Sequence, residues 1–251
     1  MVEAICGEAA KRALITGGSR GIGLGCAAAF VRAGADVTLI ARSHNELDRA
    51  AAKLRAEGGN VTVLALDLNR TAELEERLAS AGHFDILLNN AGVNRLASMV
   101  DITEDDFDFV SDVNEKGALF VSKIVVGGLI DAGKPGSIIH VSSILGHVGG
   151  PQRALYVTSK HAIEGLTKAM AVELGQYGIR VNSIAPAVIE TEMTGPILQD
   201  PDRRKWFDGK VPLGRFGRVE DIMGSVVFLA SDASSFITGA SLRIDGGWTA
   251  Q

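Results

Sequence analysis

Short apolar runs rich in Val, Ile and Leu alternate along the chain with longer stretches in which apolar residues recur every three or four positions. The short runs are typical of strands buried on both faces, and the periodic stretches are typical of amphipathic helices. We expect strands at residues 12–16, 36–41, 61–66, 86–88, 137–141, 180–184 and 241–244. The helices expected between them cover residues 21–33, the stretch after Ser43, and residues 71–79, 104–111, 116–132, 154–177 and 219–230.

The order of these elements predicts the fold. Strand–helix units follow one another with short links, which favours a parallel sheet with right-handed crossovers. We therefore predict an α/β fold: one Rossmann-type, doubly wound parallel sheet with helices on both faces. No linker, low-complexity segment or repeat divides the chain, so residues 1–251 are expected to form a single domain. Ser43 is expected to cap the second helix, with Glu46 as its capping-box partner.

Composition narrows the functional classes. The chain is 46% hydrophobic but only 5% aromatic, so aliphatic residues must build its core. The net charge of −5 argues against a general nucleic-acid binder. The two cysteines, Cys6 and Cys26, lack the spacing of metal ligands and suggest a reduced, intracellular protein. Because no signal peptide or membrane-spanning run is evident, we expect a soluble, cytoplasmic protein that does not contact the membrane.

A glycine-rich segment follows the first expected strand and leads into a helix. It reads Thr16-Gly17-Gly18-Ser19-Arg20-Gly21-Ile22-Gly23. Such a turn lets the backbone approach a pyrophosphate, while the helix N-terminus offers free N–H groups to it. Glycines also mark ordinary turns, but the flanking strand and helix favour a dinucleotide site.

The second expected strand indicates which dinucleotide. It ends in Ala41-Arg42-Ser43, without the acidic residue that usually binds the ribose 2′-hydroxyl of NAD. Arg42, with Arg20 on the neighbouring loop, could instead pair with a 2′-phosphate. Either arginine alone would read as a solvated surface residue, whereas both together predict NADP(H) as the cofactor.

A candidate acid/base pair lies in the long helix expected at 154–177. Tyr156 has Lys160 four residues later, on the same helix face, whereas Tyr177 has no such partner. A nearby ammonium lowers the pKa of a phenol towards the working range of a general base. Ser143, thirteen residues before Tyr156, lies just after the strand at 137–141 and could hydrogen-bond the substrate oxygen. Ser142 is the alternative, but the spacing favours Ser143.

Taken together, these motifs make the sequence resemble the short-chain dehydrogenase/reductase family over nearly its whole length. The motifs that carry the resemblance appear in the expected order: the glycine segment 16–23, Asn89-Asn90-Ala91-Gly92, Val113-Asn114, Ser143, Tyr156 with Lys160, and Pro186 with Thr191. The resemblance implies four catalytic roles. Tyr156 would be the general acid/base, Lys160 would lower its pKa and bind the nicotinamide ribose, Ser143 would orient the carbonyl, and Asn114 would hold a water of a proton relay.

The resemblance also implies cofactor contacts. Asp67, with Leu68 beside it, would face the adenine; Asn90 and Gly92 would lie along the ribose. The backbone of Ile189 and the hydroxyl of Thr191 would fix the nicotinamide carboxamide. The full set of expected cofactor residues is Gly17, Ser19, Arg20, Gly21, Ile22, Gly23, Arg42, Ser43, Asp67, Leu68, Asn90, Ala91, Gly92, Tyr156, Lys160, Pro186, Ile189 and Thr191.

The chain departs from the family pattern at one position, where Ala187 follows Pro186 in place of the usual glycine. If the backbone there required a positive φ, Ala187 would be strained. Substrate choice is expected to depend on residues 144–153 and on a helical lid around 190–212. His147 would either line the substrate pocket or serve only as a loop residue. None of the five histidines shows ligand spacing, so no metal is expected.

Three functions remain open on sequence alone. The first is an NADPH-dependent carbonyl reductase acting on a 3-oxoacyl thioester or a small ketone. The second is a sugar or polyol dehydrogenase working oxidatively, and the third is a catalytically silent NADP(H)-binding sensor. The closing run 239–248 resembles that of tetramer-forming family members, which implies a homotetramer. In them the last strand and the helix at 219–230 pack across a two-fold axis.

Overall fold

The computed structural model describes residues 10–192, 194–195, 199, 204–205, 207 and 209–251. Seven strands form one sheet in the order β3-β2-β1-β4-β5-β6-β7, and every neighbouring pair is parallel. The strands are β1 (Arg12–Thr16), β2 (Asp36–Ala41), β3 (Val61–Ala65), β4 (Ile86–Asn89), β5 (Gly136–Val141), β6 (Ile179–Pro186) and β7 (Ser241–Ile244). The predicted α/β, doubly wound parallel sheet is therefore confirmed.

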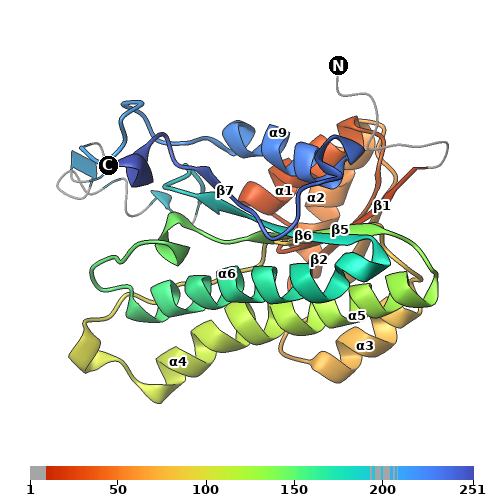
Figure 1. Cartoon of the computed structure of the whole chain (residues 1–251), viewed down its shortest axis with the longest axis horizontal. Coiled ribbons are helices and arrows are strands. Elements are labelled where there is room, and N and C mark those ends of the chain that lie inside the picture. The colour runs from red at the N-terminus through yellow and green to blue at the C-terminus, as the bar shows by residue number, and fades with distance from the viewer. Residues whose placement is uncertain (1–9, 193, 196–198, 200–203, 206, 208) are drawn as a thin grey trace.

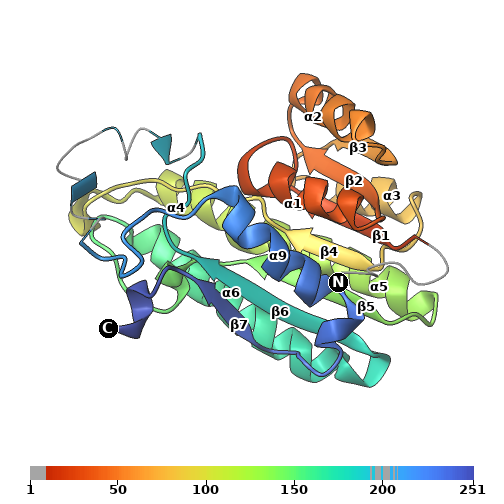
Figure 2. The ribbon, with the colours of Figure 1, turned by 90° about the horizontal axis from the view of Figure 1, so that it is seen from above.

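Helices cover both faces of the sheet, as Figures 1 and 2 show. One face carries α1 (Gly21–Arg32), α2 (His44–Ala56) and α9 (Val219–Ala230). The other carries α3 (Thr71–Ala79), α4 (Glu104–Ser111), α5 (Ala118–Asp131) and α6 (Ala154–Leu174). Two aliphatic cores, one on each side of the sheet, contain Phe30 and Phe84 as their fully buried aromatic side chains. Branched aliphatic residues suit strands that are covered on both faces.

The helix predicted at 116–132 begins differently from what the sequence indicates. A π-helical segment, η2 (Asp112–Gly117), joins α4 to α5, so that the regular helix starts at Ala118. Single π-helical turns within helices are frequent at functional sites. Asn114 lies in this segment and is buried.

The order of the strands positions a ligand crevice. Strand order reverses between β1 and β4, which are hydrogen-bonded neighbours. The loops that follow these two strands therefore diverge at the same edge of the sheet, where doubly wound proteins bind ligands. The glycine segment after β1 and Asn90–Gly92 after β4 meet at this edge.

Two expectations, the lid and Cys6, fall wholly or partly outside the described residues. Much of the predicted lid at 190–212 lies outside the described residues, although Phe207 packs edge-on against Phe216, with 6.5 Å between ring centroids. Cys6 also lies outside them. Cys26 is fully buried in α1, and burial raises the pKa of its thiol to about 12. No helix among the described residues is both long and apolar enough to cross a bilayer.

Candidate active site

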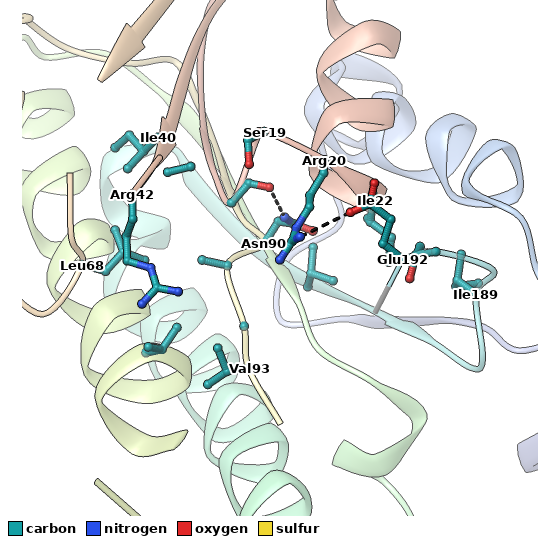
Figure 3. Close-up of a pocket in the computed structure, with 18 of the residues that line it drawn as sticks. Ser19, Arg20, Ile22, Ile40, Arg42, Leu68, Asn90, Val93, Ile189 and Glu192 are labelled. Atoms are coloured by element: carbon teal, nitrogen blue, oxygen red, sulfur yellow. Dashed lines mark hydrogen bonds and ion pairs between the residues drawn. The ribbon is translucent and has the colours of Figure 1, made fainter. Parts of the chain in front are cut away.

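A cavity of about 560 Å³ opens at the carboxyl ends of the strands (Figure 3). Its wall comes from the loops after β1, β2, β3, β4, β5 and β6 and from the start of α6. Of the residues expected from the sequence, it is lined by Gly17, Ser19, Arg20, Gly21, Ile22, Arg42, Ser43, Asp67, Leu68, Asn90, Ala91, Gly92, Ser143, Tyr156, Lys160, Pro186, Ile189 and Thr191. Gly23 and Asn114 are the two expected residues that do not line it.

The glycine turn is held by the loop that follows β4. The Thr16 hydroxyl accepts hydrogen bonds from the backbone N–H groups of Asn90 and Ala91, at 3.0 and 3.1 Å. The Asn90 amide in turn donates to the carbonyls of Thr16 and Gly17, at 3.1 and 3.0 Å. Gly17 has φ +63°, a conformation that favours glycine. Asn90 therefore holds the turn through hydrogen bonds and also lines the cavity.

Gly23 allows α1 to start directly behind this turn. A Cβ at this position would stand 2.3 Å from the carbonyl oxygen of Gly17 and 2.5 Å from Nδ2 of Asn90. The N-terminus of α1 has no side-chain cap and no acidic residue in its first turn. Its free N–H groups and helix dipole can therefore accept an anion such as a pyrophosphate.

Arg20 and Arg42 lie on the two loops that flank one end of the cavity (Figure 3). Arg20 forms an exposed ion pair of 3.3 Å with Glu192, whereas no described residue forms an ion pair with Arg42. Ser43 caps α2 by accepting from the Glu46 backbone N–H at 3.3 Å. The predicted capping box is only half formed, because the Glu46 carboxylate instead accepts from the Ser19 hydroxyl at 3.1 Å.

Ser143, Tyr156 and Lys160 come together in the wall of the same cavity. Ser143 follows β5 and is buried, and its hydroxyl accepts from the Leu145 backbone N–H at 3.2 Å. Ser143 is close enough to Tyr156 to lower the pKa of the phenol. Lys160 lies 5.5 Å from the centroid of the Tyr156 ring and donates to the carbonyl of Val141 at 2.8 Å.

The charge states of this group follow from burial. Burial raises the pKa of Tyr156, and this effect exceeds the opposing effects of the Ser143 hydrogen bond and the Arg153 charge. Burial also lowers the pKa of Lys160 to about 8, against an opposing effect of the Glu164 charge. A net lowering of the Tyr156 pKa by Lys160 was expected from the sequence, and in this structure that expectation is wrong. Desolvation disfavours both the phenolate and the ammonium.

Asn114 is held in place by three hydrogen bonds. Its amide accepts from the Val93 backbone N–H at 2.8 Å and donates to the Val93 carbonyl at 2.9 Å and to the Ser159 hydroxyl at 3.0 Å. A Cβ on Gly92 would stand 3.5 Å from its Oδ1 and 3.7 Å from Lys160 Nζ. Asn114 and Lys160 thus flank the space beside Gly92, although Asn114 itself does not line the cavity.

The segment after β6 is unstrained at the position where the family pattern is broken. Gln152 is the only non-glycine with positive φ among the described residues, so Ala187 adopts an ordinary conformation. Its N–H donates to the carbonyl of Ile244 at 3.1 Å. Thr191 lies within 3.8 Å of the Cβ position of Gly21, and Thr194 donates to the Ile189 carbonyl at 2.5 Å. This segment therefore lies against the start of α1.

Several residues of the site are not evident from sequence reasoning. The hydroxyl of Thr16, the carboxylates of Glu46 and Glu192, and Ser159 all contact expected site residues. His147 does not line the cavity; its Nε2 lies 2.9 Å from the Ser241 hydroxyl. The hydroxyl of Ser142 is buried without a partner in the described structure. The described residues contain no cluster of three or more His, Cys, Asp or Glu side chains able to hold a metal.

Comparisons with known proteins agree with this geometry. A protein-family model described as enoyl-(acyl carrier protein) reductase matches residues 17–249. The chain is similar to L-xylulose reductase from Bos taurus, with 38% identity over 242 residues that cover 96% of this chain and 98% of the relative. It is 37% identical to gluconate 5-dehydrogenase from Gluconobacter oxydans (strain 621H), over 95% of this chain and 94% of the relative.

A solved structure is also similar to this chain in sequence and fold. The crystal structure of a gluconate 5-dehydrogenase from Burkholderia cenocepacia J2315, in complex with NADP and tartrate, matches with a TM-score of 0.92. The two chains are 35% identical, and the match covers 96% of each. The similarity therefore extends over nearly the whole chain.

Proposed function

Because the chain belongs to the short-chain dehydrogenase/reductase family, we propose that it transfers a hydride between NADP(H) and a sugar-like alcohol/carbonyl substrate, with Tyr156 as general acid/base. One observation carries the proposal. The same cavity is lined by an anion-accepting glycine turn, by Arg20 and Arg42, and by the Ser143–Tyr156–Lys160 group. A cofactor that spans this cavity would bring its reactive ring next to the phenol.

The residues present fit NADP(H). The uncapped N-terminus of α1 suits the pyrophosphate, and Arg42 lies where it can pair with a ribose 2′-phosphate. Arg20 would add a second guanidinium if its exposed ion pair with Glu192 opened, and such exposed pairs contribute only about 0–1 kcal/mol. The relative from Burkholderia cenocepacia binds NADP, which supports this choice.

The chain's own residues supply the proton chemistry. The bound nicotinamide would give or take the hydride. In the reductive direction, the Tyr156 phenol donates its proton to the substrate oxygen, while the Ser143 hydroxyl hydrogen-bonds the same oxygen. The Lys160 ammonium then stabilises the phenolate, and Asn114 would anchor the water through which the proton is replaced. In the oxidative direction, the phenolate accepts the proton of the substrate hydroxyl.

The raised pKa of Tyr156 favours the protonated phenol at neutral pH, which is the form that the reductive reaction uses. A phenol whose pKa lies above its usual value is protonated there, which is the form that donates to a carbonyl oxygen. Oxidation requires the phenolate, so its rate should increase towards alkaline pH. The names of the relatives include both a reductase of a ketose and a dehydrogenase of a sugar acid.

A second candidate, a sugar-acid substrate, is favoured by the charge of Arg153. This residue immediately precedes α6, one turn before Tyr156, and it is half-buried. Its charge acts on the Tyr156 hydroxyl, which means that it would also act on a substrate bound there. A carboxylate on the substrate would gain a charge–charge attraction from Arg153 that a neutral polyol lacks.

A substrate panel tests the proposal. Reduction of ketoses, keto-sugar acids, 3-oxoacyl thioesters and small ketones with NADPH is measured by nicotinamide absorbance, as is oxidation of the matching alcohols with NADP⁺. We expect the polyhydroxylated substrates to react most efficiently. Thioester turnover alone would contradict the substrate class, and tight NADP(H) binding without any turnover would favour a silent sensor. We further propose that residues 1–251 act as one catalytic domain, with the 190–212 segment as its substrate lid.

A further inference from the structure

A buried carboxylate lies directly behind the proposed catalytic lysine. Glu164 follows Lys160 by one helical turn on α6, and it is only 5% exposed. Both of its oxygens accept from the Ser183 hydroxyl on β6, at 3.1 and 2.9 Å. Oε1 also accepts from the Ser241 hydroxyl on β7, at 3.1 Å. A buried carboxylate is costly unless it is hydrogen-bonded in this way, so the position demands a reason beyond packing.

The same carboxylate is tied to the turn that carries Ser143. His147 ends the short helix η3 (Ile144–Gly146), which Ser143 caps. Its Nε2 lies 3.4 Å from Glu164 Oε1 and 2.9 Å from the Ser241 hydroxyl. A Cβ on Gly146 would stand 3.1 Å from Glu164 Cγ, so the turn packs tightly against the glutamate. Glu164 therefore joins β6, β7 and the Ser143 turn to the helix that holds Tyr156 and Lys160.

The titratable side chains around Lys160 leave Glu164 as its counter-charge. On α6 they are Tyr156 and Glu164, and β5 contributes His140. Arg153, just before the helix, acts on Tyr156. Burial and the Lys160 charge lower the pKa of His140 to about 4, so this histidine is neutral near pH 7. The strands β6 and β7 contribute the Ser183 and Ser241 hydroxyls to this cluster, and the η3 turn contributes His147.

We propose that Glu164 is a positioning residue that acts through Lys160: its buried carboxylate keeps the lysine charged and, with His147 and Ser241, holds the Ser143 turn against α6. This role rests on the proposed function, since it assumes that Lys160 serves the Tyr156 acid/base. With the carboxylate present, burial lowers the pKa of Lys160 only to about 8, which leaves the ammonium predominant near pH 7. Without the Glu164 charge, the hydrogen bond to the Val141 carbonyl is left to oppose desolvation, so the pKa of Lys160 should fall further.

The test measures the ionisation of Lys160 directly. Glu164→Gln removes the charge but keeps an oxygen that accepts from Ser183 and Ser241. The protein is labelled with a small amine-reactive reagent over a pH series, and mass spectrometry resolves the extent of labelling at Lys160. Exposed Lys168, on the same helix, is the internal reference, and Glu173→Gln, an exposed carboxylate of α6, is the matched control. We expect the midpoint at Lys160 to fall by about one pH unit in Glu164→Gln and to stay unchanged in the control.

A second variant keeps the test decisive if Glu164→Gln does not fold. Glu164→Asp retains the carboxylate but withdraws it by one methylene, and we expect a smaller downward shift. Because labelling needs neither substrate nor cofactor, it reports on Glu164 even if the proposed function fails. An active enzyme should additionally show the same displacement in the pH profile of kcat. Midpoints that equal the wild-type value in every folded variant would overturn the proposal, as would equal loss of kcat at all pH values.

Discussion

The Lys160 ammonium donates a 2.8 Å hydrogen bond to the carbonyl of Val141, the last residue of β5. Ser143 follows Val141 by two residues, and Tyr156 precedes Lys160 by one helical turn. One side chain thus connects the helix that carries the proposed acid/base to the strand end that carries its hydrogen-bonding partner. Because Lys160 is buried, its position is well defined, but the burial of its charge costs stability.

That cost predicts a pH dependence of stability. The pKa of Lys160 is about 8 in the folded protein, against 10.5 for a lysine in the unfolded chain. Below about pH 8 the lysine is charged in both states and its full desolvation cost applies. Between about pH 8 and about pH 10 the unfolded state binds more protons, so the wild type should gain about 2–3 kcal/mol relative to Lys160→Met.

Urea unfolding of both proteins across this pH range measures the difference. Lys168→Met, which changes an exposed lysine of the same helix, should show no comparable trend. A stability difference between wild type and Lys160→Met that stays constant with pH would mean that Lys160 is not desolvated as described.

Arg42 is expected to determine the choice of cofactor. In Arg42→Asp, the carboxylate should repel a 2′-phosphate and accept a hydrogen bond from a 2′-hydroxyl instead. We expect the ratio of kcat/KM for NADPH over NADH to fall by about 100-fold or more, the value of two charge-assisted hydrogen bonds. Arg49→Asp, an exposed arginine further along α2, is the control. A wild type that prefers NADH would contradict the assignment.

Gly23 is predicted to be essential for the geometry of the phosphate turn. In Gly23→Ala the new methyl group would meet the Gly17 carbonyl, so the turn or α1 must shift. We expect a loss of about 1–3 kcal/mol of stability and at least about tenfold weaker NADPH binding. Gly165→Ala is a suitable comparison, because a Cβ there meets nothing within 4 Å, and it should be neutral or stabilising by about 1 kcal/mol. Equal behaviour of the two variants would contradict the packing argument.

Assembly into a homotetramer remains a prediction. Phe236 is fully exposed, and Phe228 of α9 and Leu242 of β7 are more than a third exposed. Phe228 and Leu242 belong to the helix and strand expected to pack across a two-fold axis, and Phe236 lies in the turn between them. Phe236→Asp should therefore reduce the assembly to a smaller species in size-exclusion chromatography with light scattering, whereas Val100→Asp, on the loop before α4, should not. A monomeric wild type would refute the expectation.

Most of the fold could be predicted because its signals are local. Strands covered on both faces leave continuous apolar runs, which marked most of the sheet. All seven strands were found, and β1, β2 and β7 have the expected bounds. Glycines marked the phosphate turn, and the four-residue spacing of Tyr156 and Lys160 marked one helix face. The π-helical segment η2 was missed, since its backbone depends on Asn114 bonding to Val93 and Ser159 rather than on local propensity.

The remaining features of the site depend on contacts between distant segments. Glu46 looked like a capping-box residue, but the Ser19 hydroxyl, brought close by the β1–β2 pairing, competes for its carboxylate. Glu164 looked like one polar position of a helix, and only the fold brings Ser183, Ser241 and His147 to it. The pKa of Tyr156 was mispredicted because the sequence shows the nearby lysine but not the burial that outweighs it.

The central claim is that Tyr156 exchanges the proton that accompanies hydride transfer. Tyr156→Phe removes only the hydroxyl, so kcat should fall by at least about 1,000-fold, in line with the loss of a general acid. The dissociation constant for NADPH, followed by nicotinamide fluorescence, should stay within about threefold of the wild-type value. Tyr177→Phe, which alters the other tyrosine of the chain, should leave both quantities unchanged. Retention of wild-type kcat in Tyr156→Phe would contradict the claim.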